Sequence, residues 1–516
     1  MSTPLMLSFD VGSQSIRVML VNMQGEIIDM QQSKFEKAYI SIKENYAEQK
    51  PNFYFEHCIK AVSKLMSRNI ESNIVGMALG CIRDTTVCLD KQYKPIRNSI
   101  VWVDKREVKQ NPKIPVFKKI IFSMVKMKAI IYRQYKQSVC NWIAINEPEI
   151  WEKTDKYVML PTYLNYCFTG ILKDSVANMI GHIPFNAKKR KWMDKNSITR
   201  FIFDVPKEKL CELCEPGDII GYVTKEISEL SGIPEGIPLI ATGADKGLEA
   251  IGLSVISPNQ AALSFGTASV IQVTTKNYVE PAPFVPAYVA PVKGYYNSEI
   301  QTYRGYWMVS WFKQEFAPLE VEQAKQQGIK VEKLLDSYLQ EVPAGCEGLM
   351  LQPYWVSGVT TPTAKGAIIG FNEVHTKKHI YRAIIEGIAF SLLDGMYQLQ
   401  KRTGNKITEI FVGGGGSHSD IACQITANIF GVPLKRTQSP EITGVGGAII
   451  GFIGLKYFEN EQDAIKSMVH TGTVFMPDEK EHEYYFQLYH GVYKHLFKKL
   501  NPLYQNISNI RDKVGR

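Results

Sequence analysis

Residues 6–22 have the sequence MLSFDVGSQSIRVMLVN, in which two apolar runs flank a turn of small polar residues. This pattern predicts a β-hairpin. The turn Gly12-Ser13-Gln14-Ser15 offers backbone N–H groups and hydroxyls to an anion, while Asp10 at the strand end offers a carboxylate to a cation, with Arg17 beside them. The stretch suggests a Mg²⁺–phosphate site. An ordinary hairpin is the alternative for the stretch taken alone.

A second stretch repeats this arrangement half a chain later. Residues 260–275, QAALSFGTASVIQVTT, place two apolar runs around a Gly266-Thr267 turn, and the tripeptide LSF of residues 7–9 recurs at residues 263–265. Two such hairpins predict an internal duplication with both turns facing one cleft. Chance similarity is the alternative, and the partner motifs described below favour the duplication.

Length and composition set the broad class. With 516 residues the chain exceeds what one hydrophobic core normally holds, so we expect two large domains, residues 1–250 and 251–516. A hydrophobic content of 45% and a charged content of 22% are typical of a soluble globular protein. The net charge of +9 permits contact with nucleic acid or membranes, but a preference for phosphorylated ligands explains it as well.

The location and the partner classes follow from what the sequence lacks. The first strand begins close to Met1 and no apolar run approaches membrane-spanning length, so we expect a cytoplasmic protein without a signal peptide or a membrane span. Nine cysteines are scattered along the chain, and the Cys211–Cys214 pair has no second pair to complete a zinc site, so ordinary reduced thiols are expected. The sequence contains no helix-turn-helix or zinc module, so we do not expect a nucleic-acid partner.

Apolar runs and helical spacings alternate along the chain, which predicts an α/β fold. Residues 51–69 have helical spacing and residues 74–79 form the next expected strand. Polar side chains follow apolar strands twice, as Arg83-Asp84 and as Trp102 with Asp104. Because α/β proteins bind ligands at strand ends, these four residues predict a pocket for a hydroxylated molecule, in which charged groups bind hydroxyls and the indole covers a carbon face. The alternative is a surface ion pair and a core tryptophan.

Residues 105–137 mix lysine and arginine with apolar residues, as in FKKIIFSMVKMKAIIYRQYKQ at 117–137. A basic amphipathic helix binds a membrane surface or an acidic partner, but lysine stems also cover a protein surface while their ammonium groups stay in water. The pattern favours the solvated helix. Further along, residues 157–170 predict a buried helix closed by Gly170, and residues 219–223 predict a strand.

Residues 237–247 deliver Asp245 from a strand into a glycine-rich turn. A carboxylate there can take the proton of a sugar hydroxyl as that oxygen attacks the terminal phosphate of a nucleotide. A helix N-cap is the alternative, and both roles are compatible.

Three stretches complete the second half. Residues 366–371 form a turn before a helix at 379–386, residues 411–419 lead a strand through four glycines into a helix, and residues 441–448 open a helix of small residues suited to tight packing. Glycines at a strand-to-helix turn let a base or phosphate approach the backbone closely.

Taken in order, these motifs resemble the FGGY family of carbohydrate kinases, which has the actin-like ATPase fold of two duplicated ribonuclease-H-like domains flanking a catalytic cleft. DVGSQSIR at residues 10–17 is similar to the family's first phosphate motif, and LSFGT at 263–267 to its second. GADKG at 243–247 is similar to its catalytic segment and GGGSHS at 414–419 to its adenosine motif. Residues 366–386 resemble a further family signature, with Phe371 where a smaller aliphatic residue is usual.

The resemblance implies ATP and Mg²⁺ as cofactors and a role for each matching residue. It implies Asp245 as general base, Asp10 as the Mg²⁺ residue acting through water, and a sugar or polyol as acceptor. The residues implied around the phosphates and adenosine are Gly12, Ser13, Gln14, Ser15, Arg17, Gly266, Thr267, Gly414, Gly415 and Ser419, and those implied at the acceptor are Arg83, Asp84, Trp102, Asp104 and Lys246.

The chain departs from the glycerol kinase pattern at three positions. Asp84 stands where glycerol kinase has Glu, Lys246 where it has Gln, and Gln14 where Thr or Ser is usual. A cation next to Asp245 is expected to lower the pKa of the base, and it also suits a transferring phosphoryl group or an acidic acceptor.

The reaction we expect is phosphoryl transfer in a cleft that closes to exclude water. Glycerol, a ketopentose and an autoinducer-2-like compound are the acceptors considered. The competing class is an actin-like nucleotide switch or a degenerate kinase that only binds sugar. The sequence does not decide whether the protein forms a homodimer.

Overall fold

The chain forms two compact units in the computed structural model, which describes residues 3–69, 73–124, 127–283, 285–358 and 361–513. The first unit comprises Met1–Ser254, Tyr288–Tyr296 and Glu441–Val469, and the second comprises Val255–Ala287, Asn297–Pro440 and His470–Arg516. The chain first leaves the first unit close to the boundary expected at residue 250, but it returns there twice. One of these returns contains the small-residue helix that follows Glu441.

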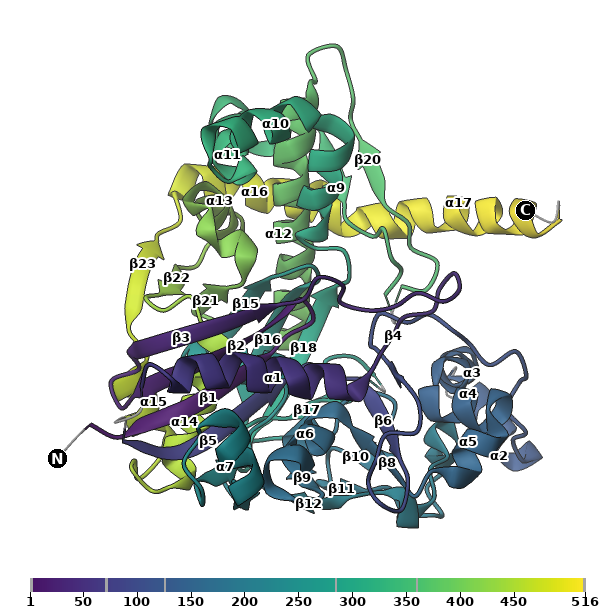
Figure 1. Ribbon diagram of the computed structural model, residues 1–516. Coiled ribbons are helices and arrows are strands. Elements are labelled where there is room, and N and C mark those ends of the chain that lie inside the picture. The colour runs from purple at the N-terminus through teal and green to yellow at the C-terminus, as the bar shows by residue number, and fades with distance from the viewer. Residues whose placement is uncertain (1–2, 70–72, 125–126, 284, 359–360, 514–516) are drawn as a thin grey trace. The chain divides into compact units, whose positions relative to one another are not determined.

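The first unit is built on a sheet with the strand order β13–β14–β5–β1–β2–β3 (Figure 1). β1 pairs with β2 in antiparallel and with β5 in parallel, β14 is parallel to β5, and β13 is antiparallel to β14. The strands are β1 (Leu5–Val11), β2 (Ser15–Asn22), β3 (Ile27–Lys34), β5 (Ile74–Cys81), β13 (Ile219–Tyr222) and β14 (Pro238–Ile240).

Six strands of the seven-stranded sheet of the second unit repeat this order, as β23–β22–β21–β15–β16–β18, and the pairs described next repeat the orientations. β15 is antiparallel to β16 and parallel to β21, β22 is parallel to β21, and β23 is antiparallel to β22. The predicted duplication is therefore confirmed at the level of strand topology. The strands are β15 (Gln260–Phe265), β16 (Ser269–Thr275), β18 (Tyr296–Thr302), β21 (Glu409–Gly413), β22 (Leu434–Thr437) and β23 (Thr471–Phe475).

Strand β1 shows why its run of apolar residues is almost unbroken. Successive side chains of a strand point to opposite faces of the sheet. Leu7 and Phe9 join the core formed with helix α1 (Pro51–Met66), whereas Ser8 donates a 2.7 Å hydrogen bond to the carbonyl of Gly444 in helix α14 (Ile442–Gly454). Both faces are covered, so β1 has apolar residues on both, as central strands of α/β sheets do.

The remaining elements of the first unit surround this sheet. A smaller sheet has the order β4–β7–β6–β8, and short two-stranded pairs join β9 to β12 and β10 to β11. The strands are β4 (Glu48–Gln49), β6 (Thr86–Leu89), β7 (Ser99–Ile100), β8 (Lys156–Met159), β9 (Lys173–Ser175), β10 (Phe185–Asn186), β11 (Lys191–Trp192), β12 (Glu212–Cys214) and β17 (Tyr288–Val289). The helices are α2 (Val116–Met124), α3 (Lys128–Gln137), α4 (Val139–Asn146), α5 (Pro148–Lys153), α6 (Leu160–Thr169), α7 (Lys225–Ser231), α8 (Asp245–Gly252) and α15 (Glu461–Met468), with short 3₁₀ turns at Val176–Asn178, Arg200–Phe203 and Lys207–Lys209.

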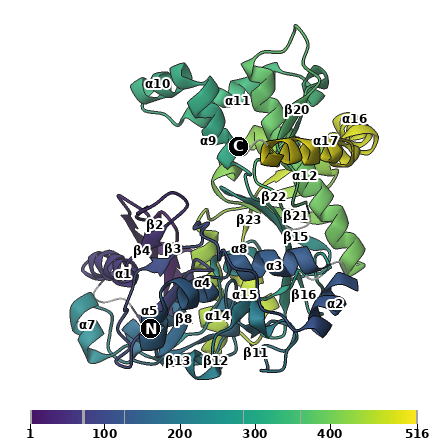
Figure 2. The same ribbon diagram turned by 90° about the vertical axis from the view of Figure 1, so that its right-hand side faces the viewer.

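The second unit packs its helices around the long helix α12 (Lys377–Thr403), which runs along its sheet (Figure 2). Thr376 and His379 form a capping box at its start, and Gly404, with a left-handed φ of 75°, ends it. The other elements are β19 (Met350–Gln352), β20 (Ala367–Ile369), α9 (Trp307–Phe316), α10 (Pro318–Gln327), α11 (Val331–Glu341), α13 (Asp420–Phe430), α16 (Glu479–Leu488) and α17 (Lys494–Lys513), with a π turn at Tyr489–Tyr493 and 3₁₀ turns at Ala344–Gly348 and Gly415–His418.

Two local predictions need correction. The helix expected at residues 157–170 begins only at Leu160, because residues 156–159 pair with β6 as strand β8. Gly170 does end it, with a φ of 72°. The basic segment 105–137, of which residues 125–126 lie outside the described residues, forms two helices, α2 and α3, rather than one.

The structure also bears on the expectations about cysteines and membrane spans. All nine cysteines are free thiols. Among the helices of the described ranges, none combines the length and the apolar character needed to cross a membrane.

Candidate active site

The first predicted turn lies at the end of the β1–β2 hairpin in the first unit. The ladder pairs Asp10 with Arg17, and the Arg17 Nη1 lies 3.2 Å from the Asp10 Oδ2. The Arg17 Nε lies 3.4 Å from the Glu441 Oε2. Glu441 immediately precedes α14, so the arginine links the hairpin to the start of that helix.

Asp10 shares its electrostatic environment with two other carboxyl groups. Burial raises the pKa of Asp10 to about 6, against the lowering effect of Arg17, and the nearby charges of Asp245 and Glu441 raise it further. A region with more carboxylates than cations favours a divalent metal ion. In the described part of the chain no group of three or more His, Cys, Asp or Glu side chains is arranged to hold a metal directly.

Asp245 is the first residue of helix α8, after strand β14. The N-cap of the helix is Ala244, so the N-cap role considered for Asp245 is wrong. Burial raises the pKa of the Asp245 carboxyl, although Lys246 and Arg83 lower it, and its Oδ1 accepts a 2.8 Å hydrogen bond from the Lys246 N–H. Lys246 therefore acts in the expected direction, but burial outweighs it.

Small residues allow α8 and α14 to pack closely, as the sequence predicts. A Cβ at Gly446 would lie 2.1 Å from the Leu248 carbonyl oxygen, and a Cβ at Gly252 would lie 1.9 Å from that of Ile442. Any side chain at either position would push the two helices apart. This contact holds the helix that carries Asp245 against the helix that follows Glu441.

Lys246 forms an ion pair with a residue of its own helix. Its Nζ lies 2.5 Å from the Glu249 Oε2, and the Glu249 side chain is buried. Burial lowers the pKa of Lys246, but Glu249 and Asp245 outweigh that effect and raise it, so the ammonium stays charged. Its charge is largely balanced before any ligand arrives.

Arg83 and Asp84 follow strand β5 in the same unit. The Arg83 guanidinium lies 5.3 Å from the centre of the Tyr288 ring. Asp84 has a left-handed φ of 56°, its Oδ1 lies 2.8 Å from the His182 Nδ1, and the same oxygen accepts a 2.9 Å hydrogen bond from the His182 N–H. A Cβ at Gly181 would lie 2.1 Å from that oxygen, so glycine is required there.

Trp102 is hydrogen-bonded to the first turn. Its indole is 44% exposed, and its Nε1 donates a 2.9 Å hydrogen bond to the Ser13 hydroxyl. An exposed aromatic face held by its edge is suited to covering the carbon face of a sugar. The alternative of a core tryptophan is wrong.

The second unit carries the other predicted turn, at the end of the β15–β16 hairpin. The carbonyl of Gly266 accepts a 3.0 Å hydrogen bond from the Tyr306 N–H, and that of Thr267 accepts one of the same length from the Gly305 N–H. With its carbonyls bonded to the segment before α9, the turn is held in one conformation.

The glycine-rich run approaches this turn closely. Gly414 has a φ of 84°, and a Cβ there would lie 3.0 Å from the Phe265 backbone, whereas a Cβ at Gly415 would meet nothing within 4 Å. A Cβ at Gly416 would overlap the Tyr306 ring, which stacks on Phe265 at 4.7 Å between ring centres. Gly414 and Gly416 are thus packing positions, and Gly415 borders open space that suits a flat base.

The comparison with known proteins bears on both units. Residues 5–252 match the N-terminal domain of the FGGY family of carbohydrate kinases, and residues 261–455 match its C-terminal domain. The chain belongs to the FGGY family of carbohydrate kinases. The predicted two-domain fold and the predicted phosphotransferase class, with an alcohol group as acceptor, are thereby confirmed.

Individual FGGY kinases match over nearly their whole length. A xylulose kinase of Staphylococcus epidermidis strain RP62A is 27% identical, covering 98% of this chain and 99% of its own. A gluconokinase of Bacillus licheniformis is 24% identical, covering 98% and 96%. A crystal structure of gluconate kinase from Lactobacillus acidophilus, 22% identical, superposes with a TM-score of 0.82 over 98% of this chain and all of the other. The family match favours a kinase over the nucleotide switch considered above.

Asp104 does not contribute to the FGGY acceptor site in the way the sequence suggested. Its side chain is only 3% exposed, and its carboxylate accepts hydrogen bonds from the Ala47 N–H at 2.6 Å and from Arg106, whose Nη2 lies 2.7 Å away. Arg106 also pairs with Glu48 and lies 4.0 Å from the ring centre of Tyr46. Asp104 is therefore part of a buried structural ion-pair cluster.

Two hydroxyls expected to contact the nucleotide have partners within the chain. Ser15 is the first residue of β2 rather than part of the turn, and its Oγ accepts a hydrogen bond from Gln32. Ser419 is the N-cap of α13, accepting from the Ala422 N–H and donating a 2.6 Å hydrogen bond to Asp336. Gln14 and Gly12 lie in the first turn, where Gly12 N–H donates to the Ser15 carbonyl.

Sequence reasoning missed Glu441 and His182. The sequence marks Glu441 only as the start of a helix, and His182 lies in an irregular stretch without a motif. No local signal marks either residue, because each acts through a partner that is distant along the chain.

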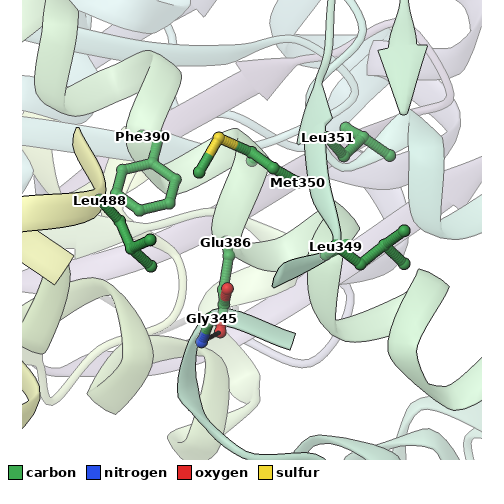
Figure 3. Close-up of a pocket in the computed structure, with 9 residues that line it drawn as sticks. Gly345, Leu349, Met350, Leu351, Glu386, Phe390 and Leu488 are labelled. Carbon is green, nitrogen blue, oxygen red and sulfur yellow. Dashed lines mark hydrogen bonds between the residues drawn. The ribbon is translucent and has the colours of Figure 1, made fainter. Parts of the chain in front are cut away.

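A pocket elsewhere in the second unit is not a candidate site. Figure 3 shows it between α12, α16 and β19, with Glu386 pointing toward Gly345. The Glu386 Oε1 accepts hydrogen bonds from Arg382 at 2.8 Å, Tyr485 at 2.7 Å and the Gly345 N–H at 3.1 Å. These polar groups satisfy one another, and the walls are otherwise mostly apolar.

Proposed function

We propose that this FGGY kinase transfers the terminal phosphoryl group of ATP to a hydroxyl of a neutral, polyhydroxylated sugar, with a ketopentose as first candidate. The observation that carries the proposal is the shared environment of Asp245 and Asp10 in the first unit. Burial raises the pKa of both carboxyl groups, and the nearby charge of Asp245 raises that of Asp10 further. Asp245 is suited to accept a proton, and Asp10 is suited to hold a hydrated cation.

Asp245 is proposed as the general base. Its carboxylate accepts the proton of the acceptor hydroxyl as that oxygen forms a bond to the terminal phosphorus and the bond to ADP breaks. A carboxyl group whose pKa lies above its ordinary value is a stronger base than an exposed aspartate. Burial supports this, because it raises the pKa, while Arg83 and Lys246 keep the charged form accessible.

The remaining first-unit residues are proposed to orient the acceptor. Trp102 offers an exposed ring, Arg83 offers donors beside Tyr288, and the Asp84–His182 pair offers a fixed carboxylate. His182 replaces Asp104 in this proposal, because Asp104 is enclosed by Arg106 and Ala47.

The second unit is proposed to bind the nucleotide. The rigid turn Gly266-Thr267 would bind phosphate through backbone N–H groups, and the open position at Gly415 would admit the adenine. Asp10 would hold Mg²⁺ through water, and the ion when bound neutralises phosphate charge during transfer. Gly12, Ser13 and Gln14 remain proposed phosphate contacts in the first turn.

A neutral acceptor is favoured over a sugar acid by the Lys246–Glu249 pair. A carboxylate on the acceptor would have to compete with the buried Glu249 for the same ammonium group. The relatives named xylulose kinases agree with a ketopentose, while the relative named gluconokinase keeps the sugar acid as a second candidate.

The test is ADP release from MgATP with a panel of xylulose, ribulose, glycerol, erythritol, gluconate and autoinducer-2. One ketopentose is expected to stimulate release. Asp245→Asn is expected to lower turnover by roughly two to four orders of magnitude while leaving ATP binding intact. Asp194→Asn, at a side chain that is 62% exposed, is the matched control and should not change turnover.

Each alternative has its own result. Stimulation by gluconate alone would reject the neutral acceptor, and near-normal activity of Asp245→Asn would reject the assignment of the base. ADP release that no compound changes, in both proteins, would reject the proposed acceptor class.

A further inference from the structure

Helix α2 exposes a continuous apolar stripe. Its exposed members are 40% to 78% accessible: Val116, Phe117, Ile120, Ile121 and Met124. They recur at intervals of one, three and four residues, which places them on one side of an α-helix. Isolated exposed apolar residues are common, but a contiguous row on one helix face indicates a binding surface.

The opposite side of α2 is fixed to the protein. Phe122 is only 4% exposed and lies in a small core with Ile114, Met127, Ile131 and Ile202. The helix lies at the outer edge of the group formed by α2 to α5 in the first unit (Figures 1 and 2). The stripe is thus held facing outward, and folding of the described chain does not cover it.

The charge around the stripe is unusually one-sided. Residues 108–137 contain eight lysine and arginine residues and no Asp or Glu, whereas Arg106 just before them is buried and paired with Asp104 and Glu48. The stretch without an acidic residue extends to residue 146. Lys118 and Lys119 stand within the helix itself, where their flexible stems can carry the ammonium groups toward an anionic surface.

We propose that α2 docks this kinase on an anionic phospholipid surface, with the helix lying in the plane of the interface. Apolar residues on one face flanked by lysines are what such a surface binds. The helix has nine residues, too few to span a bilayer. The solvated helix favoured from the sequence is revised, because the apolar residues rather than only the lysines face outward.

A second copy of this chain fits the same surface poorly. A two-fold contact would bring two strongly basic segments together, and like charges across an interface oppose association. Outside the segment the chain has no net negative charge to complement it. The lipid surface supplies both the apolar layer and the negative charge. The proposal does not depend on which sugar is phosphorylated.

The test is sedimentation of the full-length protein with phospholipid vesicles. Vesicles of phosphatidylcholine alone are compared with vesicles containing about one third phosphatidylglycerol. We expect at least about tenfold tighter binding to the anionic vesicles, and a fall in binding as salt screens the charges.

Two pairs of substitutions separate the apolar and the charged contributions. Phe117→Ser with Ile120→Ser removes part of the stripe, and Lys118→Gln with Lys119→Gln removes two charges. Each pair is expected to weaken vesicle binding by about tenfold. The matched controls are Leu319→Ser, at a leucine that is 76% exposed on α10, and Lys225→Gln, at a lysine that is 75% exposed on α7; neither should change binding.

ADP release without vesicles and thermal unfolding should be unchanged in all variants, which shows that they are folded. Equal binding to both vesicle types, no binding, or unchanged binding of the stripe variants would overturn the proposal. Sedimentation velocity adds a further outcome. If the wild type is a dimer that does not bind vesicles, and the stripe substitutions convert it to a monomer, the stripe serves self-association. That result would also overturn the lipid proposal.

Discussion

The hairpins β1–β2 and β15–β16 occupy the same place in the two duplicated sheets, yet they end differently. In the first, Phe9 pairs with Val18 and the ladder continues for two more pairs, the first of which is Asp10 with Arg17. In the second, the corresponding Phe265 forms the last pair, and the turn follows at once. The extension of the first hairpin carries its charged residues.

This difference teaches how one fold serves two chemical tasks. The first unit places charged side chains at its strand ends: Asp10, Arg17 and Arg83, with Asp245 at the start of α8. The second unit offers mainly backbone there, held by glycines and by hydrogen bonds to the turn carbonyls. Ionisable side chains suit proton transfer and cation binding, whereas backbone N–H groups suit phosphate.

Among the changes that compare the two hairpin regions, replacing the acid of the first hairpin should have the largest effect. Asp10→Asn keeps the size of the side chain but removes the charge, so we expect turnover to fall by about a hundredfold and the Mg²⁺ requirement to rise. The measurement is turnover as a function of Mg²⁺ at saturating ATP. Asp29→Asn, on strand β3 of the same sheet, is the control and should change turnover little. Wild-type turnover in Asp10→Asn at ordinary Mg²⁺ would show that the charge of the first hairpin is not needed.

Replacing a glycine of the second unit should have the next largest effect. Gly414→Ala strains a left-handed residue and presses a methyl group on the Phe265 backbone, so we expect the KM for ATP to rise by about tenfold and stability to fall by about 1–2 kcal/mol. The measurements are ATP kinetics and thermal unfolding. Gly404→Ala has a similar φ of 75° at the end of α12 and open space around it, so it should lose stability without changing the KM. Equal changes in KM for both variants would mean that the effect is not local to the turn.

Replacing the arginine of the first hairpin should have the smallest effect, visible in the pH profile. Arg17→Met removes the cation that lowers the pKa of Asp10, which should therefore rise above its value of about 6. In its proposed role Asp10 acts as a carboxylate, which loses its charge as the pH falls through its pKa. The acidic limb of the turnover profile should move to higher pH, with activity several-fold lower near pH 6 and little changed near pH 8. An acidic limb that stays in place would mean that Asp10 does not control it.

The sequence predicted the frame of this site well. The two hairpins, the strand before Asp245, the glycine run after β21 and the tight helix after Glu441 are all present. Each depends on residues that are neighbours in the chain, so apolar periodicity and turn residues are sufficient to predict it. The strand and turn before Asp245 suggested its role as a base, and the family resemblance implied the same role.

The sequence could not predict which side chain each polar residue contacts. Asp104 and Ser15 had suitable residue types in suitable places, but their polar atoms are taken by Arg106 and Gln32. Asp84 was expected to line a pocket with Arg83, but the sequence did not indicate that its carboxylate contacts His182. A side chain's partner depends on how distant segments pack, and polar residues of the same type serve equally well in structure and in a site.

The sequence by itself therefore determined the duplicated α/β fold, the family and the carboxylate proposed as base, because these are encoded in local patterns and in the order of motifs. Only the tertiary structure decided that Arg17 bridges Asp10 and Glu441, that Glu249 balances Lys246, and that the apolar side of α2 faces outward. Burial and charge pairing are properties of the packed chain. They arise when segments far apart in sequence exclude water together, and no single segment contains that information.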